Sequence, residues 1–180
     1  EGGTGFGQHS HRDMEIMSYV LDGALEHQDS MGNTTVIRPG EIQRMSAGTG
    51  VVHAEQNKSK DKKTHFLQIW VMPDQINLKP SYAQKSFAAD LAKKDLVLVL
   101  SKTGREGSLT INQDADIYLS KLSTGTRHTF AADPKRGIWV QVIKGDLKVQ
   151  DVELKAGDGA AITNEKALEL ISINEAEFLL

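Results

Sequence analysis

The sequence predicts an all-β protein made of two antiparallel β units joined by a short irregular or helical connection. Three observations support this fold class: short β-rich runs recur over residues 16–72, strand-like runs resume at residue 96, and part of the first half is echoed in the second. Only residues 82–94, rich in Ala, Lys, Gln and Asp, resemble a helix. We place the boundary after residue 94, so that the units are residues 1–94 and 95–180.

The first half contains six strand-like runs separated by Gly, Asp and Pro. This spacing is typical of an antiparallel sandwich or barrel, and Asp22-Gly23 provides the turn chemistry of a hairpin. The runs are Ile16–Leu21, Leu25–Gln28, Thr34–Ile37, Ile42–Met45, Val51–Glu55 and Phe66–Met72. Residues 1–7 are interpreted as a loop, and because the chain opens on Glu1 we expect a fragment or processed form whose first unit lacks its first strands.

An internal repeat relates the two halves. Without gaps, Glu15–Asp29 aligns with Gly137–Asp151, and the matched positions include the hairpin glycines Gly23 and Gly145. Farther along, two hydrophobic-to-turn passages, Val36–Glu41 and Glu153–Asp158, both end in Gly followed by an acidic residue, here called the Gly-acid turn. Two copies of one β unit are the simplest explanation.

Composition excludes several classes of protein. The chain has 21 Lys and Arg against 24 Asp and Glu, a net charge of −3, so no basic patch for nucleic acid is expected from bulk charge. The absence of Cys excludes disulfide scaffolds, Cys-ligated metal centres and thiol nucleophiles. The apolar runs are far shorter than the roughly 20 residues of a membrane-spanning helix. We therefore expect a cytoplasmic monomer with no nucleic-acid or membrane partner.

Two short motifs carry candidate metal ligands. His9 and His11 are two residues apart, as are His53 and Glu55. In an extended chain such residues project from one face, about 6.6 Å apart. If the two segments face each other, three imidazoles and one carboxylate converge on one point. This donor set suits a divalent first-row metal with open positions for water, substrate or O₂.

The second copy lacks these ligands. Offsets taken from the hairpin and from the Gly-acid turn carry the four positions to Ala131, Asp133, Leu170 and Ser172. None of these is a His or Glu. We therefore expect the second unit to be a degenerate, metal-free copy.

The segments Gly5–Arg12, Tyr19–Gly23, Glu26–Ser30 and Met45–Glu55 together resemble the pirin family of bicupins, in particular bacterial pirin-like quercetin 2,3-dioxygenases. The resemblance extends over essentially the whole chain. It implies two jelly-roll cupin barrels, and it implies that His9, His11, His53 and Glu55 are the ligands of one metal ion. Glu15 occupies the place of a glutamate that other cupins use, but the resemblance leaves it outside the ligand set.

The resemblance also implies an activity. A flavonol such as quercetin loses the proton of its 3-hydroxyl, and O₂ adds across C2 and C4 with loss of CO. We expect Glu55 to act as general base or hydrogen-bond partner for that hydroxyl. Three imidazoles and a carboxylate accept Fe, Mn, Ni, Co, Cu or Zn, and cellular supply favours Fe.

Two other functions remain open. The same ligands would serve a non-enzymatic pirin-type module, either a transcription co-regulator or a redox sensor, or a cupin that uses its metal as a Lewis acid without O₂. His27 and His65 are interpreted as structural or surface residues, although His27 would line the cavity if it points inward. Trp70 and Trp139 are interpreted as core residues.

Overall fold

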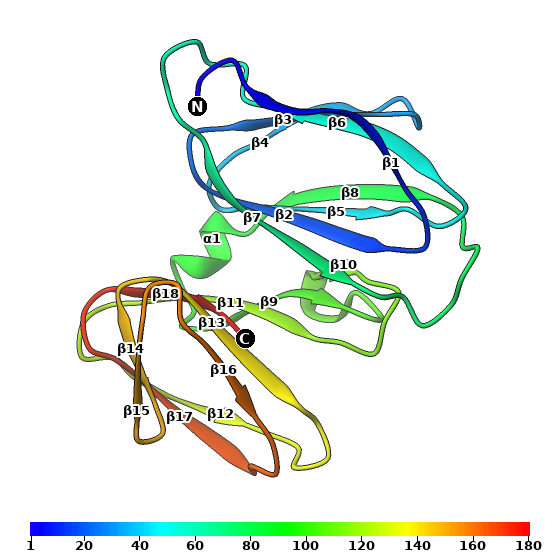
Figure 1. Cartoon of the computed structure of the whole chain (residues 1–180). Helices are drawn as coiled ribbons and strands as arrows, with labels where there is room; N and C mark the ends of the chain where they lie inside the picture. Colours follow the sequence, from blue (N-terminus) through cyan, green and yellow to red (C-terminus); the bar gives the residue numbers. More distant parts are fainter. The chain divides into compact units, whose positions relative to one another are not determined.

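A computed structural model describes residues 1–180 and is almost entirely β-structure (Figure 1). The predicted all-β fold of two cupin-like domains is confirmed. No helix has the length and apolar character needed to cross a membrane. The elements are β1 (Gly5–His11), β2 (Glu15–Asp22), β3 (Leu25–Asp29), β4 (Thr34–Ile37), β5 (Glu41–Ser46), β6 (Val51–Gln56), β7 (His65–Val71), β8 (Ser81–Ser86), α1 (Ala88–Leu91), β9 (Val97–Ser101), η1 (Arg105–Gly107), β10 (Leu109–Thr110), β11 (Ile117–Leu122), β12 (Arg127–Ala131), β13 (Ile138–Lys144), β14 (Asp146–Val149), β15 (Val152–Lys155), β16 (Gly159–Ile162), β17 (Ala167–Ser172) and β18 (Ala176–Leu179).

The chain divides into two compact units that differ from a simple cut after residue 94. The first contains residues 1–89 and 99–116, and the second contains residues 90–98 and 117–180. Residues 99–116 join the first unit because hydrogen bonds attach them to it. Ser46 Oγ and the backbone and side-chain amides of Asn112 all donate to the buried carboxylate of Glu15, at 2.9–3.2 Å. A buried carboxylate satisfied in this way fixes the segment on the outside of β2.

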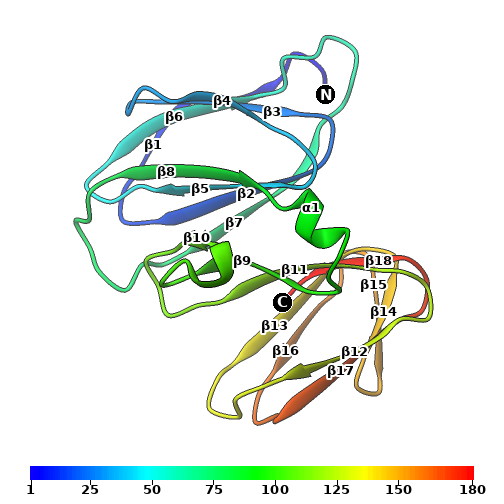
Figure 2. The same cartoon turned by 180° about the vertical axis from the view of Figure 1, so that it is seen from behind.

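The first unit contains two four-stranded antiparallel sheets, with the orders β1-β6-β3-β4 and β7-β2-β5-β8 (Figure 2). Both faces of β2 are buried, and its side chains alternate between them. Ile16 packs with Met45 and Val51, and Val20 packs with Leu25 and Ile37. Because side chains alternate along the strand, Ser18 shares the face of Ile16 and Val20, whereas Glu15 lies on the opposite face, towards Asn112.

Two local expectations are wrong. Residues 5–7 are not loop, because β1 begins at Gly5 and pairs with β6. Residues 82–94 are not one helix, because Ser81–Ser86 forms strand β8 along β5, and only Ala88–Leu91 is helical. In both segments the hydrogen bonds of a neighbouring strand outweigh a weak local preference.

The second unit repeats the topology of the first. The strand order β18-β13-β16 corresponds to β7-β2-β5, and β12-β17-β14-β15 corresponds to β1-β6-β3-β4. The hairpin glycines are equivalent as well, since Gly23 has φ +78° and Gly145 has φ +74°. The shared strand orders and glycine conformations support the repeat inferred from sequence. A core cluster that includes Leu147, Leu168 and Phe178 fills the second unit.

Gly145→Ala is expected to destabilise the protein. The added Cβ would lie 1.8 Å from the carbonyl oxygen of Glu175, and a φ of +74° strains any residue with a side chain. We expect a loss of roughly 1–3 kcal/mol or more in the free energy of unfolding, measured by urea titration. Gly137→Ala is the control, because its Cβ would meet nothing within 4 Å. Equal stabilities of the two variants would contradict this reading of the hairpin.

Candidate metal centre

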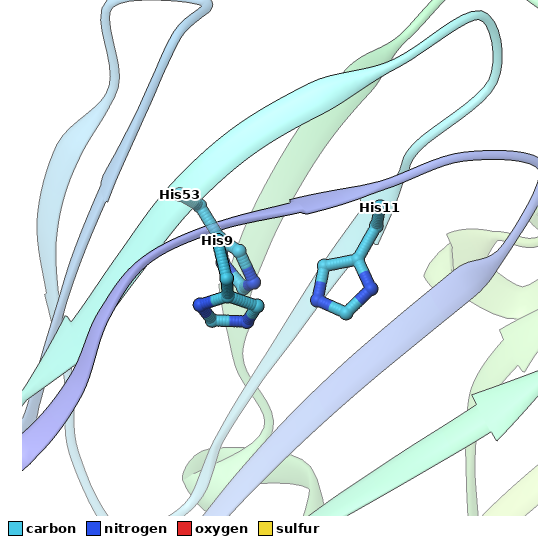
Figure 3. Close-up of side chains that lie close together, drawn as sticks. All are labelled: His9, His11 and His53. Carbon is cyan, nitrogen blue, oxygen red and sulfur yellow. The ribbon is translucent and has the colours of Figure 1, made fainter.

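Three imidazoles from two paired strands gather inside the first unit. His9 and His11 come from β1 and His53 from β6, and His9 lies opposite His53 in the antiparallel register. Figure 3 shows the three rings on the same side of their strands. The ring centroids are 4.4 Å apart for His9 and His53, 4.8 Å for His9 and His11, and 4.9 Å for His11 and His53. One nitrogen from each ring lies within 4.8 Å of the other two.

The nitrogens of this group are arranged as metal ligands would be. The Nε2 atoms of His11 and His53 are buried and have no hydrogen-bond partner. His9 uses Nδ1 to donate to the carbonyl oxygen of Gly7 at 2.7 Å, which leaves its Nε2 lone pair free. Buried nitrogens without partners are costly unless a ligand satisfies them. The residues present therefore fit a divalent transition metal.

Electrostatics favour neutral imidazoles in this group. Burial, followed by the neighbouring His9, His27 and His11, lowers the pKa of His53 to about 3. Burial and His9 also lower the pKa of His11 below its usual value. A metal binds neutral imidazole, so both shifts favour the form with a free lone pair.

Glu55 lies beside this group but does not join it. The four predicted ligands do not form a single cluster: Glu55 belongs to a second group with His27 and His53. Its two oxygens accept hydrogen bonds, at 3.0 Å from Ser18 Oγ and at 2.5 Å from Gln68 Nε2. The structure thus gathers the three histidines and holds the buried carboxylate of Glu55 two residues along β6 from His53.

His27 lies inside the unit, which is the alternative that the sequence left open, but its contacts with His53 and Asp29 are not predicted from sequence. Its side chain is fully buried, with Nδ1 3.4 Å from His53 Nδ1 and Nε2 3.0 Å from Asp29 Oδ2. Burial acts to raise the pKa of Asp29, but hydrogen bonds from His27 and Asn33 outweigh it and lower that pKa. The signal in the sequence is His27-Gln28-Asp29, which has the same two-residue spacing as the two ligand motifs.

Aromatic side chains lie next to the histidines. The Trp70 ring is 5.1 Å from that of His11, and Phe6 lies 6.3 Å from His9 and 6.4 Å from Phe66. The interpretation of Trp70 and Trp139 as core residues is wrong, because they are 54% and 56% exposed. Trp70 therefore offers an accessible aromatic surface beside the candidate metal centre.

The strand pairing corrects the equivalent positions in the second unit. His27 pairs with Glu55 between β3 and β6, and the corresponding pair between β14 and β17 is Val149 with Leu170. The same alignment replaces His53 by Leu168 and His9 by Phe130, the partner of Leu168. The offsets taken from sequence therefore match Leu170 to His53, whereas strand pairing matches it to Glu55. The sequence assignments of Ala131, Asp133 and Ser172 are displaced as well. The positions equivalent to His9, His27, His53 and Glu55 are apolar and belong to or pack against the core.

Comparisons with known proteins agree with this architecture. The family described as Pirin matches residues 2–71, and the family described as Quercetinase C-terminal cupin domain matches residues 98–180. A quercetin 2,3-dioxygenase from Escherichia coli K12 is 42% identical over 180 residues, which cover the whole of this chain and 77% of that protein.

Solved structures give the same relationship. The bacterial pirin YhhW from Escherichia coli, in complex with nickel(II), is 41% identical with a TM-score of 0.93, over 99% of this chain and 76% of that one. A quercetin 2,3-dioxygenase from Acinetobacter baumannii, at 24% identity and a TM-score of 0.82, shares the fold over 97% of this chain and 66% of its own. Because the identity extends over the whole of this chain and both domain families match, this chain belongs to the pirin family, among bacterial pirin-like bicupins.

Proposed function

We propose that this protein is a metal-dependent dioxygenase that cleaves flavonols such as quercetin with O₂ and releases CO. The observation that carries the proposal is the group of three imidazoles, in which the buried Nε2 atoms of His11 and His53 have no hydrogen-bond partner. The name of the 42% identical relative supports the reaction, and the nickel in the YhhW complex supports a single divalent metal. No observation favours the regulatory module over the enzyme.

His9, His11 and His53 would hold the ion, and Glu55 would supply the fourth ligand, which requires its carboxylate to approach His9 and His11 more closely than it does in this structure. Three imidazoles and a carboxylate suit several first-row metals, and we favour Fe on grounds of cellular supply. When bound, the ion would act as a Lewis acid towards the flavonol and would support reaction with O₂. The residues of the chain then have to place the substrate, accept its proton and restrict the access of water.

Glu55 is our candidate for accepting the 3-hydroxyl proton. Ser18 and Gln68 both donate to it, so its oxygens are aimed by fixed partners inside the unit. Loss of that proton gives a flavonolate. O₂ adds across C2 and C4, and cleavage of the O–O bond together with the bonds from C3 to both carbons then expels C3 with its oxygen as CO. The two O₂ oxygens remain in the product, an ester of two aromatic acids, so every atom is accounted for. Glu55 returns the proton as the product forms.

Trp70 is expected to contribute to flavonol binding. Its exposed indole lies next to His11, where it can stack on a flat aromatic ring. We expect Trp70→Ala to raise KM for quercetin about 2- to 12-fold, the equivalent of about 0.5–1.5 kcal/mol, with a smaller change in kcat. Trp139→Ala, which removes an equally exposed indole from the second unit, is the matched control. A KM unchanged by Trp70→Ala would remove this residue from the binding surface.

Turnover measurements test the function. Metal-free protein would be loaded separately with Fe, Mn, Ni, Co, Cu and Zn, and O₂ uptake and CO release would be followed with quercetin in large excess. We expect many turnovers per chain, equal amounts of O₂ consumed and CO released, and none in metal-free protein. One bound metal per chain without O₂ uptake would contradict the enzyme and favour the regulatory module. Conversion of a substrate without O₂ would instead favour a Lewis-acid cupin.

A further inference from the structure

Three side chains in successive contact, those of His53, His27 and Asp29, lead away from the metal centre. His53 contacts His27 through their Nδ1 atoms at 3.4 Å, and His27 contacts Asp29 from Nε2 to Oδ2 at 3.0 Å. His27 and His53 are both buried, and the reaction proposed above makes no use of His27 or Asp29. A buried imidazole with two directed contacts raises the question of which nitrogen carries each proton.

If both imidazoles are neutral, only one assignment of protons satisfies every contact among these three side chains. Asp29 is a carboxylate and can only accept, so the Nε2 atom of His27 carries the proton. Neutral His27 then has a lone pair on Nδ1, which accepts the Nδ1 proton of His53. His53 is left with a lone pair on Nε2, the buried atom that lacks a protein partner and belongs to the three-histidine group. The reverse assignment would aim a lone pair of His27 at a carboxylate oxygen.

Asp29 is itself held firmly. Its Oδ1 accepts from the backbone amides of Met31 and Asn33 at 2.9 and 3.0 Å, and the side-chain amide of Asn33 donates to both oxygens. The ring of Tyr82 packs on that of His27, with centroids 4.9 Å apart. Asp29 is therefore fixed by hydrogen bonds from the turn between β3 and β4, and His27 is packed against Tyr82 of β8.

We propose that Asp29 and His27 form a hydrogen-bond relay that fixes His53 in its Nδ1-protonated form and holds the His53 Nε2 lone pair towards the metal. Carboxylates commonly orient metal-binding imidazoles directly, and here a second imidazole lies between them. The inference rests on the proposed metal centre, but it concerns how one ligand is prepared. His27 and Asp29 are positioning residues.

The second unit is consistent with this role. Val149 replaces His27 and Leu168 replaces His53, so the relay is absent where the ligand is absent. The position equivalent to Asp29 is still an acid, Asp151, but it is exposed. An acidic residue in this turn therefore occurs without the relay, whereas the buried His27 occurs only together with His53.

The first test needs neither metal nor substrate. Nitrogen-15 NMR on the metal-free protein reports which nitrogen of each histidine carries the proton. We expect His53 protonated on Nδ1 and His27 protonated on Nε2. His53 protonated on Nε2 would overturn the relay. The NMR result is independent of the turnover measurement. The expected tautomers without O₂ uptake would count against the dioxygenase alone, and His53 protonated on Nε2 together with turnover would count against the relay alone.

Variants test the consequence for metal binding. In Asp29→Asn, the three donors at Oδ1 hold the amide oxygen there, so the NH₂ group faces His27 and reverses both tautomers. In His27→Phe, the Nδ1 proton of His53 loses its acceptor. We expect each to weaken metal affinity about 10- to 100-fold in a chelator competition, and to change the visible spectrum of the cobalt-loaded protein. His65→Ala, which removes an exposed histidine from the same unit, should change neither.

Two outcomes of the variant and metal-content measurements would overturn the relay. Asp29→Asn that folds, as judged by circular dichroism, and keeps both the wild-type affinity and the cobalt spectrum would show that the tautomer is set elsewhere. Two metals per wild-type chain, with one lost in His27→Phe, would make His27 a ligand and not a relay. If either variant fails to fold, the NMR measurement on the wild-type chain still decides.

Discussion

His53→Ala is expected to abolish both metal binding and turnover. His53 belongs to both groups of candidate ligands, so its loss leaves only His9 and His11 in the first and only His27 and Glu55 in the second. The fall in metal affinity should exceed the roughly 10- to 100-fold that follows loss of an outer hydrogen-bond partner. Metal content per chain after dialysis, chelator competition and O₂ uptake with quercetin measure the effect.

The control for this change is His65→Ala. His65 lies on β7 in the same unit, but it is exposed and belongs to neither ligand group. It should keep one metal per chain and wild-type turnover. Retention of a full equivalent of tightly bound metal by His53→Ala would refute the proposed centre.

Glu55→Gln is expected to have the second largest effect, a fall in kcat of about 10²- to 10⁴-fold at saturating metal. The amide has no basic oxygen to accept the 3-hydroxyl proton. Ser18 and Gln68 both donate to the carboxylate, so one of them would face the new NH₂ group. Rates of O₂ uptake, with metal content measured on the same samples, separate loss of the base from loss of metal.

Glu26→Gln is the matched control for Glu55→Gln. Glu26 lies on β3 next to His27, so its side chain points away from the relay and pairs with Lys58 at 3.2 Å. The same change of carboxylate to amide should leave turnover intact there. Normal turnover by metal-loaded Glu55→Gln would exclude Glu55 from proton transfer.

Much of the candidate centre could be predicted from sequence because it rests on local spacing. His9 and His11 share a strand face by the two-residue rule, and so do His53 and Glu55. What spacing cannot supply is the distance between partners on different strands. The hydrogen bonds that hold Glu55 against Ser18 and Gln68 depend on the register of β2, β6 and β7, so its separation from His9 and His11 appears only in the structure.

The contacts of His27 with His53 and Asp29 are not predictable from sequence for a related reason. A single histidine in a strand is more often structural than functional, and its importance depends on Asp29 in the same strand and His53 across the sheet. β1 was partly missed because its Gly-rich start at Gly5 has little strand preference of its own. It is a strand because β6 supplies its hydrogen bonds.

The repeat was recognised, but the equivalent positions were displaced. The offset of 117 residues taken from the Gly-acid turns still holds for Met45 and Ile162, which are the partners of Ile16 and Ile138. Glu55 and Leu170, however, are only 115 residues apart, because the passage from β16 to β17 is two residues shorter than the passage from β5 to β6. An offset taken from the Gly-acid turns is therefore right for β16 and wrong for β17. Strand pairing restores the match and places Leu168 and Leu170 where His53 and Glu55 lie.

Anomalous X-ray diffraction at the absorption edge of the bound metal tests the central claim most directly. We predict one metal peak per chain, in the first unit, about 2.0–2.2 Å from the Nε2 atoms of His9, His11 and His53. Glu55 should be the only carboxylate ligand, and no peak should lie near Phe130, Leu168 or Leu170. A peak bound by His27 with no contact to His9 and His11, or a peak in the second unit, would contradict the account.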